Sequence, residues 1–317
     1  MLLQECEIFL ATSGNALSLL KIEFPQLHFF EIAGYNPVYP SGNGSMVWKM
    51  AFQLHKFLST ISKEQVQIEA LVEQNQVDLV ISDNRYGAFS LKAKSVFITH
   101  QLNIPMPSRW RWMDGVVNYF NHRQIRKFSE CWLPAPGASL LGPLSTDIKG
   151  VKTRYIGYLS RFEKKHLPVK NDVLVICSGP EPQRGIFENL LTTQLQSSKL
   201  RYKIVRGDLS PAKSGYVSTQ NSHVSNFMNS EELNVAIEES KIIVSRSGYS
   251  TVMDLAKLGS KAIFIPTPNQ TEQEHLATEL RNRGIAFSMG QSSFDIEKAL
   301  QETDKYAGFV NFEQDTS

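Results

Sequence analysis

The amino-acid sequence predicts an α/β fold with two Rossmann-like domains, and three observations support this prediction. Short apolar runs alternate with helix-like stretches through most of the chain, which is typical of βα units around a parallel sheet. The chain has 317 residues, a length that suits two domains of ordinary size. The segment Arg161–Pro168 is polar, lacks a hydrophobic period and contains a proline, as linkers do. We therefore expect an N-terminal domain over residues 1–160 and a C-terminal domain over residues 161–317.

In the N-terminal domain, five apolar runs have the length of strands and one long stretch has a helical period. Apolar residues recur at helical spacing through Trp48–Gln74, so we expect a long helix there. The expected strands are Glu7–Ala11, His28–Ile32, Leu79–Ser82, Ser95–Ile98 and Cys131–Leu133.

The C-terminal domain alternates more regularly. Its expected strands are Asp172–Cys177, Tyr202–Val205, His223–Phe227, Lys241–Ser245, Ala262–Ile265 and Ile285–Ser288. Its expected helices are Gln183–Gln194, Ser230–Glu239, Ser250–Leu258 and Thr271–Arg283. Two domains of this kind place a ligand at the carboxyl ends of their strands, in the crevice between them.

Composition and charge exclude several classes of protein. The chain is 42% hydrophobic and 20% charged, as in a soluble globular protein, and its net charge of +2 argues against nucleic acid as an obligate partner. Cys6, Cys131 and Cys177 lie far apart and form no CxxC pair, so we expect neither a disulfide framework nor a zinc site, and a reducing cytoplasm fits. We see no apolar run of the roughly 18 residues that a membrane span needs, and no signal peptide.

The segment Ser245–Leu255 carries the strongest functional signal. A buried strand runs into a turn of small residues and a helix begins near Ser250, so the free backbone N–H groups of the turn form an anion site. Gly248 would let the backbone approach a phosphate closely. Asp254 lies about one turn into the helix, where a carboxylate can bridge two ribose hydroxyls. The alternative is a serine-capped helix with a solvated Asp254.

A second polar loop follows the next expected strand. The run Pro266–His275 starts with two prolines that fix a loop and continues into a polar cluster that opens a helix. We expect this loop at the same sheet edge as Ser247 and Gly248. Gln273 and Glu274 then offer donors and acceptors to sugar hydroxyls. The alternative is that both are ordinary residues of a first helical turn.

The stretch Val244–Gly284 resembles the donor-binding half of MurG-like glycosyltransferases, the family that transfers N-acetylglucosamine from its UDP carrier. In that family a S-G-x-x-T-x-x-E run is followed by a strand, a proline-containing loop and a glutamine-rich helix start. Ser247, Gly248, Thr251 and Asp254 match the run, with aspartate in place of glutamate.

The resemblance implies a GT-B fold and a role for each matched position. It implies that Asp254 holds the ribose and that Gln273 and Glu274 read the donor sugar, with Glu274 in place of a glutamine. Tyr249 and Ser250 lie inside the matched run and are further donor-binding candidates.

A candidate phosphate loop follows the first strand of the C-terminal domain. Ser178 and Gly179 begin a tight turn ahead of a helix, where exposed N–H groups and the helix dipole favour an anion. The family has a glycine-rich loop here, whereas this chain has Pro180 and Pro182. Arg184 would add a fixed positive charge towards a leaving diphosphate. The alternative is a plain βα turn with a surface arginine.

Two loops of the N-terminal domain follow apolar strands and are expected at strand ends that face the ligand. Asp83 and His100 are the candidate general bases, because an inverting transfer removes a proton from an acceptor hydroxyl. The second loop also resembles the H-E-Q-N stretch of the MurG-like family. The acceptor-side candidates are Asn84, Arg85, Gln101 and Asn103. The alternatives are an aspartate that caps the next turn and a histidine that is packed.

The run Pro107–Met113 interleaves basic residues with tryptophan and precedes the apolar run Val116–Phe120. Such a pattern is typical of contact with a membrane surface, which fits a lipid-linked acceptor and a cytoplasmic protein at the inner face of the membrane. The alternative is core packing with a basic rim.

The start of the N-terminal domain departs from the family pattern. MurG-like proteins begin with a strand, a Gly-rich loop ending in histidine, and a helix, whereas Met1–Ala11 resembles the second strand of that domain. We therefore expect the first βα unit to be absent. The chain is then either truncated at its start or completed by another piece, and in both cases neighbouring strands lose their central partner.

These observations favour an inverting, metal-independent glycosyltransferase of cell-envelope biogenesis. A UDP-sugar, UDP-N-acetylglucosamine by resemblance, would bind the C-terminal domain, and a glycan or lipid-linked acceptor would enter from the N-terminal domain. Helix N-termini and Arg184 would stabilise the leaving diphosphate, so no cofactor or metal is expected, and the chain has no DxD motif. The alternatives are a catalytically incomplete subunit that binds a nucleotide sugar and, less favoured, a sugar-nucleotide epimerase.

Overall fold

The computed structural model describes residues 6–35, 46–104, 106, 108–135, 148–208 and 221–310. The chain divides into two compact units. Unit 1 comprises Met1–Ile104, Gly115–Leu133 and Pro143–Tyr155, and unit 2 comprises Pro105–Asp114, Pro134–Gly142 and Ile156–Ser317. The predicted domain boundary at residue 160 stays a prediction.

Unit 2 contains a six-stranded parallel sheet in the order β12-β11-β10-β7-β8-β9. Its strands are β7 (Asn171–Ile176), β8 (Tyr202–Val205), β9 (Ser222–Ser225), β10 (Ser240–Ser245), β11 (Ala262–Phe264) and β12 (Phe287–Ser288). The chain moves from β7 outward to β9, then returns to β10 beside β7 and moves outward in the other direction. The strand order therefore reverses between β7 and β10, which is where doubly wound sheets bind ligands.

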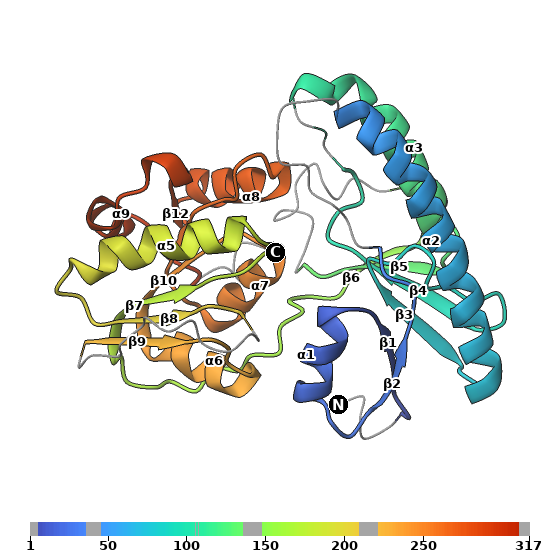
Figure 1. The fold of residues 1–317 in the computed structure, drawn as a ribbon, viewed down its shortest axis with the longest axis horizontal. Helices are drawn as coiled ribbons and strands as arrows, with labels where there is room; N and C mark the ends of the chain where they lie inside the picture. Colours follow the sequence, from blue (N-terminus) through green and yellow to red (C-terminus); the bar gives the residue numbers. More distant parts are fainter. Residues whose placement is uncertain are drawn as a thin grey trace. The chain divides into compact units, whose positions relative to one another are not determined.

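Helices cover both faces of this sheet, and Figure 1 shows α5 and α6 on opposite sides of it. The helices are α5 (Gln183–Gln196), α6 (Ser230–Glu238), α7 (Tyr249–Leu258), α8 (Thr271–Asn282) and α9 (Ile296–Thr303), with the short 3-10 helix η4 (Gln291–Ser293). Phe187 and Leu191 of α5 pack with Val173 and Val244 of the strands in one buried apolar cluster. Asn229 caps α6, and Glu232 returns the bond in a capping box.

Unit 1 contains two parallel sheets among its described residues. Its strands are β1 (Phe9–Thr12), β2 (His28–Glu31), β3 (Leu79–Asp83), β4 (Lys94–Ile98), β5 (Glu130–Leu133) and β6 (Thr153–Tyr155). One sheet pairs β1 with β2, and the other has the order β3-β4-β5-β6. The helices are α1 (Asn15–Glu23), α2 (Met46–Asn75) and α3 (Asp114–Ile125). The 3-10 helix η2 (Ser108–Met113), which precedes α3 in the sequence, belongs to unit 2.

Packing in unit 1 centres on α2 and on β4. Ile68 and Val72 of α2 contact the buried Ile32 and Ala88, and Phe97 of β4 is fully buried. Among the described residues, β1 and β3 are each paired along one edge only. The absence of a first βα unit stays a prediction.

The sheet elements match the predicted runs closely, with exceptions that have local causes. Strand β6 is three residues long and reads Thr-Arg-Tyr, so it offers no apolar run to detect. Helix α1 and helix α9 were not predicted either. Helix α2 was expected over Trp48–Gln74 and spans Met46–Asn75. The α/β fold with two sets of parallel βα units is confirmed.

Candidate functional site

The two donor-side loops of unit 2 meet at one edge of the six-stranded sheet. Strand β10 pairs in parallel with β11, so the loops that follow these strands leave the sheet side by side. The Ser247 hydroxyl donates a 2.7 Å hydrogen bond to the backbone carbonyl of Gln273. The Gln273 side-chain oxygen accepts a 2.8 Å bond from the backbone N–H of Thr267. The sequence-based expectation that the turn after β10 and the loop after Pro266 share an edge is therefore confirmed.

The turn after β7 lies at the same edge, because β10 pairs with β7 on its other side and Ser245 stands opposite Ile176. Gly179 has φ 95°, a conformation that favours glycine. A Cβ atom at Gly179 or at Gly248 would meet no heavy atom within 4 Å. Both turns thus leave open space beside their backbone, as an anion site at a helix N-terminus requires.

Asp254 of α7 is partly buried and already carries a partner. Its carboxylate accepts a 2.6 Å hydrogen bond from the Ser160 hydroxyl, which also accepts a 3.1 Å bond from the Phe162 backbone N–H. Burial raises the pKa of Asp254, and the Ser160 hydrogen bond and the charge of Arg161 act against that rise. The carboxylate predicted to hold a ribose therefore also anchors the segment that precedes β7, a contact across 94 positions that the sequence does not reveal.

The two polar residues expected to read the sugar differ in exposure. Gln273 is buried and uses its side-chain oxygen within the loop, as described above. Glu274 is exposed, and its carboxylate accepts a 3.0 Å bond from the Asn269 backbone N–H. Asn269 has φ 66°, so the Glu274 carboxylate supports a strained turn.

The remaining candidates of the matched run lie in the first turn of α7. Tyr249 is buried, and its hydroxyl donates a 2.6 Å hydrogen bond to the Pro134 carbonyl, while burial raises the pKa of that hydroxyl. Its side chain therefore has a packing role in unit 2. Ser250 is exposed and Thr251 is partly buried.

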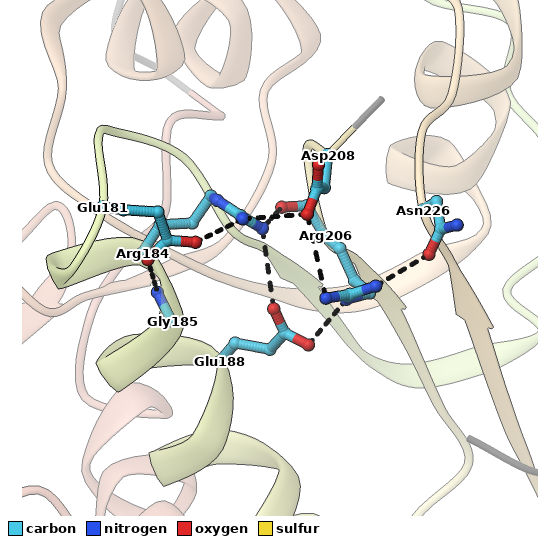
Figure 2. Close-up of polar contacts among 7 residues, drawn as sticks. All are labelled: Glu181, Arg184, Gly185, Glu188, Arg206, Asp208 and Asn226. Carbon is cyan, nitrogen blue, oxygen red and sulfur yellow. Dashed lines mark hydrogen bonds and ion pairs between the residues drawn. The ribbon is translucent and has the colours of Figure 1, made fainter. Parts of the chain in front are cut away.

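Arg184, predicted as a cation facing a diphosphate, is held in an internal network (Figure 2). It lies in the first turn of α5 and is buried. Its guanidinium pairs with Glu181, lies 3.0 Å from the Asp208 carboxylate and 3.6 Å from the Glu188 carboxylate, and donates to the Arg206 carbonyl at 2.9 Å. Its charge is thus shared among three carboxylates.

The same network holds Arg206 at the end of β8. Its guanidinium donates to Glu188 at 2.6 Å and to the Asn226 side chain at 2.9 Å, and lies 3.9 Å from Asp208 (Figure 2). Arg206 and Glu188 are almost fully buried. The network therefore joins the ends of β8 and β9 to α5. The spacing of Arg184 and Glu188, four residues apart on a helix, is the one signal that the sequence offered for it.

Arg246 lies in the turn after β10, and the sequence analysis predicted no role for it. Its side chain is fully buried and lies over the Phe187 ring, with the guanidinium carbon 4.3 Å from the ring centre. It donates to the carbonyls of Ile265 and Pro266 at 3.0 and 3.2 Å. It also donates to the Gln183 carbonyl at 3.1 Å and to the Gln291 side chain at 2.5 Å.

In unit 1, the two predicted acceptor-side loops also lie side by side. Asp83 stands opposite Ile98 in the pairing of β3 with β4, and the Asn84 backbone N–H donates to the Ile98 carbonyl at 3.0 Å. Burial raises the pKa of Asp83, and the charge of His100 opposes this rise. The two candidate bases are therefore electrostatic neighbours. Gln101 continues the turn, with its backbone N–H on the Thr99 hydroxyl at 3.1 Å.

The other two acceptor-side candidates are engaged inside unit 1. The Arg85 guanidinium pairs with the fully buried Glu64 of α2 and donates to the Ala33 carbonyl at 2.5 Å. The Asn103 side chain lies 3.1 Å from the ring nitrogen Nε2 of His122 on α3. Both contacts fix a loop to a helix, so both side chains stabilise the fold of unit 1.

Other features of the described residues do not add to this site. A hollow of about 300 Å³ is lined by Asp172, Lys241 and Asp304 among others, at the amino ends of β7 and β10 and thus opposite the candidate edge. Across the part of the chain that the structure describes, no group of three or more His, Cys, Asp or Glu side chains is placed to hold a metal ion. In the same part, no helix has the length and apolarity that crossing a membrane requires.

Part of the chain matches a known protein family, and most of it is similar to known proteins. Residues 187–311 match the glycosyltransferase family 28 C-terminal domain. A UDP-N-acetylglucosamine--N-acetylmuramyl-(pentapeptide) pyrophosphoryl-undecaprenol N-acetylglucosamine transferase from Actinobacillus pleuropneumoniae serotype 5b (strain L20) is 24% identical over 251 residues, covering 76% of this chain and 67% of that protein. The protein of the same name from Buchnera aphidicola subsp. Schizaphis graminum (strain Sg) is 31% identical over 150 residues, which cover 45% of this chain and 41% of that protein.

Solved structures share the fold at low sequence identity. MurG from Acinetobacter baumannii matches 99% of this chain and 85% of its own, with a TM-score of 0.52 and 15% identity. The glycosyltransferase SnogD from Streptomyces nogalater matches 97% of both chains, with a TM-score of 0.58 and 14% identity. Together with the loops at the edge of the six-stranded sheet, these matches show a glycosyltransferase of the GT-B fold whose residues 187–311 match the family 28 C-terminal domain and whose chain is similar to MurG.

Proposed function

We propose that the protein transfers N-acetylglucosamine from a UDP carrier to a glycan or lipid-linked acceptor, with inversion at the anomeric carbon and without a metal ion. The relatives named above are transferases of N-acetylglucosamine that act on a pyrophosphoryl-undecaprenol acceptor. The UDP-sugar would bind unit 2, and the acceptor would be activated by a base of unit 1.

One observation carries the donor part of this proposal. The turn at Ser247 and the loop after Pro266 are joined by the hydrogen bond from Ser247 to the Gln273 carbonyl, at the edge where the strand order reverses. Three helices, α5, α7 and α8, begin at this edge, and their N-terminal N–H groups favour an anion. A diphosphate leaving group fits such an edge, and the helix termini would stabilise the charge that develops on it.

The acceptor part rests on Asp83 and His100. A carboxylate whose pKa is raised by burial is a stronger base than an ordinary aspartate, and the charge of the neighbouring His100 limits that rise. We propose Asp83 as the group that removes the proton from the acceptor hydroxyl. The transfer rate should then fall as the pH drops through a pKa above that of an ordinary aspartate, and this acid limb should vanish in Asp83→Asn, which should be almost inactive.

The decisive experiment combines binding and turnover on the full chain. Calorimetry should detect UDP binding to the wild-type protein, and Asp254→Asn should weaken it by about tenfold or more because a charge-assisted hydrogen bond to the ribose is lost. Asp172→Asn is the matched control, since Asp172 is a half-exposed aspartate at the opposite end of the same sheet. Failure of the wild-type protein to bind UDP would refute the proposal.

Turnover separates the transferase from its alternatives. Radiolabelled UDP-N-acetylglucosamine should yield labelled lipid-linked product only when acceptor is present, and the new bond should be of opposite anomeric configuration by NMR. Binding without product would favour a catalytically incomplete subunit. Conversion of the UDP-sugar with no acceptor present would favour an epimerase.

A peripheral membrane contact is part of this proposal and rests on helix α3. Val116 and Tyr119 are 66% and 65% exposed, and their spacing of three residues puts them on one helix face, with the exposed Arg123 one turn further on. Apolar residues beside a basic residue on an exposed helix face suit the surface of an anionic bilayer. The contact would hold the enzyme near a lipid-linked acceptor.

Vesicle sedimentation tests this contact. The double variant Val116→Ser/Tyr119→Ser should bind phosphatidylglycerol-containing vesicles several-fold less than wild type, because about 0.8 kcal/mol per buried CH₂ group is lost. Val310→Ser, which removes an equally exposed valine of unit 2, is the control. Equal binding of the double variant and the control would exclude α3 as the contact.

A further inference from the structure

The arginines at the candidate edge differ in how their charge is balanced. Arg184 and Arg206 face three carboxylates, those of Glu181, Glu188 and Asp208, so this network carries no surplus positive charge (Figure 2). Arg184 was predicted to supply a fixed positive charge to a diphosphate. In this network its charge is balanced by carboxylates of the protein itself.

Arg246 has no such balance among the described residues. Its side chain is 1% exposed and its described partners are all neutral: three backbone carbonyls, the Gln291 amide and the Phe187 ring. Its Nε atom is buried without a hydrogen-bond partner. Burial lowers the pKa of Arg246 to about 10, so the group still carries a full charge at neutral pH.

The Cys177 thiol, which acts electrostatically on Arg246, does not supply a counter-charge. Burial raises the pKa of the Cys177 thiol to about 12, so Cys177 is neutral at pH 7. A buried charge without a counter-ion costs several kcal/mol in the folded state. Such a cost is retained in a protein when the charge acts on something that arrives later, such as an anionic ligand.

The hydrogen bonds of Arg246 also show which parts of the edge it organises. Its acceptors come from three separate connections: Gln183 at the start of α5, Ile265 and Pro266 after β11, and Gln291 in η4 after β12. Arg246 itself stands between β10 and α7. One guanidinium therefore ties together the four connections from which α5, α7, α8 and η4 begin.

We infer that Arg246 is the cation that positions a nucleoside diphosphate at this edge: it locks the loops that flank the strand reversal and places an uncompensated positive charge beneath them. This inference rests on the proposed UDP-sugar binding. Arg246 acts through the loops and through its field, since all four donated bonds go to the protein itself. The phosphates of a ligand, and not its base or sugar, are the groups that this charge selects.

UDP and uridine are the two probes that isolate this role, because they differ only in the diphosphate. Both are titrated into the full chain by calorimetry, uridine to millimolar concentrations. In Arg246→Met, UDP affinity should fall about thirtyfold, the order expected when one charge acts on another across about 8 Å at an effective dielectric constant of about 20. Uridine affinity should change less than about threefold, since uridine carries no charge. Arg246→Lys keeps the charge and should keep the ratio of UDP to uridine affinity within about threefold of wild type.

Arg281→Met is the matched control, because Arg281 also lies over a phenylalanine, Phe287, and donates to a carbonyl, that of Ser288, but is exposed. It should leave both affinities unchanged. An Arg246→Met variant that binds UDP as tightly as the control, or that loses UDP and uridine affinity equally, overturns the inference. Should Arg246→Met fail to fold, Arg246→Lys decides, and a tenfold fall in its ratio of UDP to uridine affinity overturns the inference. Failure of the wild-type protein to bind UDP at all would instead refute the proposed function.

Discussion

Removal of Glu188 should destabilise unit 2 by about 3–5 kcal/mol, because it leaves buried arginine charge without its partner. The side chains of Glu188 and Arg206 are 4% and 2% exposed, and their charged atoms are 2.6 Å apart (Figure 2). The Arg184 guanidinium lies 3.6 Å from the same carboxylate. Glu188→Leu therefore removes the carboxylate nearest to the buried Arg206 guanidinium, which keeps the Asp208 carboxylate at 3.9 Å.

The double variant Glu188→Leu/Arg206→Met should be less destabilised than Glu188→Leu alone. Replacement of both members of a buried ion pair by apolar residues removes the uncompensated charge and is often close to neutral. Here it leaves the Asn226 side chain without its 2.9 Å bond from Arg206, at a cost of about 1 kcal/mol. We expect the second substitution to recover about 2–3 kcal/mol, a coupling that a double-mutant cycle measures.

The assay must report on unit 2, because two units need not unfold in one step. All four tryptophans lie at or before Trp132, so tryptophan fluorescence is a poor reporter of β7 and β8. Hydrogen exchange of peptides from these two strands, followed through a urea series, gives the local free energy of opening. Glu279→Gln is the control, since Glu279 forms a partly exposed pair with Arg283 worth less than about 1 kcal/mol. If Glu188→Leu costs no more than this control, the network contributes no buried electrostatic stability.

Three further outcomes follow from single contacts. Tyr249→Phe should cost about 1–3 kcal/mol in unit 2, measured by the same exchange assay, because the buried Pro134 carbonyl loses its 2.6 Å partner. Gly207→Ala should cost more than about 2 kcal/mol, since Gly207 has φ 63° and an added Cβ would lie 2.6 Å from the backbone carbonyl oxygen just after β7. The Trp132 hydrogen bond and those of two lysines lower the pKa of Glu130 to about 2, so their stabilisation is present above pH 4.5 and is lost as the pH falls towards 2. Glu130→Gln should flatten this part of the acid-unfolding curve of unit 1, followed by circular dichroism.

The sequence predicted the sheet edge well because the signals for it are local. Apolar runs of four to six residues mark β7, β8, β10 and β11, and parallel strands that alternate with helices must all send their carboxyl ends to one edge. The junction of the Ser247 turn with the Pro266 loop follows from that geometry without any long-range information. The same reasoning placed the Asp83 and His100 loops at strand carboxyl ends, and the pairing of β3 with β4 brings them together.

The partners of the polar side chains could not be predicted in the same way. Asp254 meets Ser160 across 94 positions, and Arg184 meets Asp208 across 24, so neither pairing has a signature in sequence spacing. In the sequence Arg246 is one more polar residue of a turn, and only the structure shows that it is buried and surrounded by carbonyls. Residue type and strand position thus predict where a charge lies along the chain, whereas burial and partners decide whether that charge remains available to a ligand.

That distinction changes how the edge of the six-stranded sheet works. On the side of β8 and β9, two arginines are balanced by three carboxylates, so the field there is neutral to negative. On the side of β10 and β11, Arg246 has no counter-ion among the described residues. Under the proposed function, a dianionic group would therefore be drawn towards the reversal between β7 and β10 and away from the end of β8. The uncharged parts of the proposed nucleotide sugar would then face the Gln273 loop on one side and the β8–β9 end on the other. The asymmetry of charge would thus orient the donor along the edge before any specific contact forms.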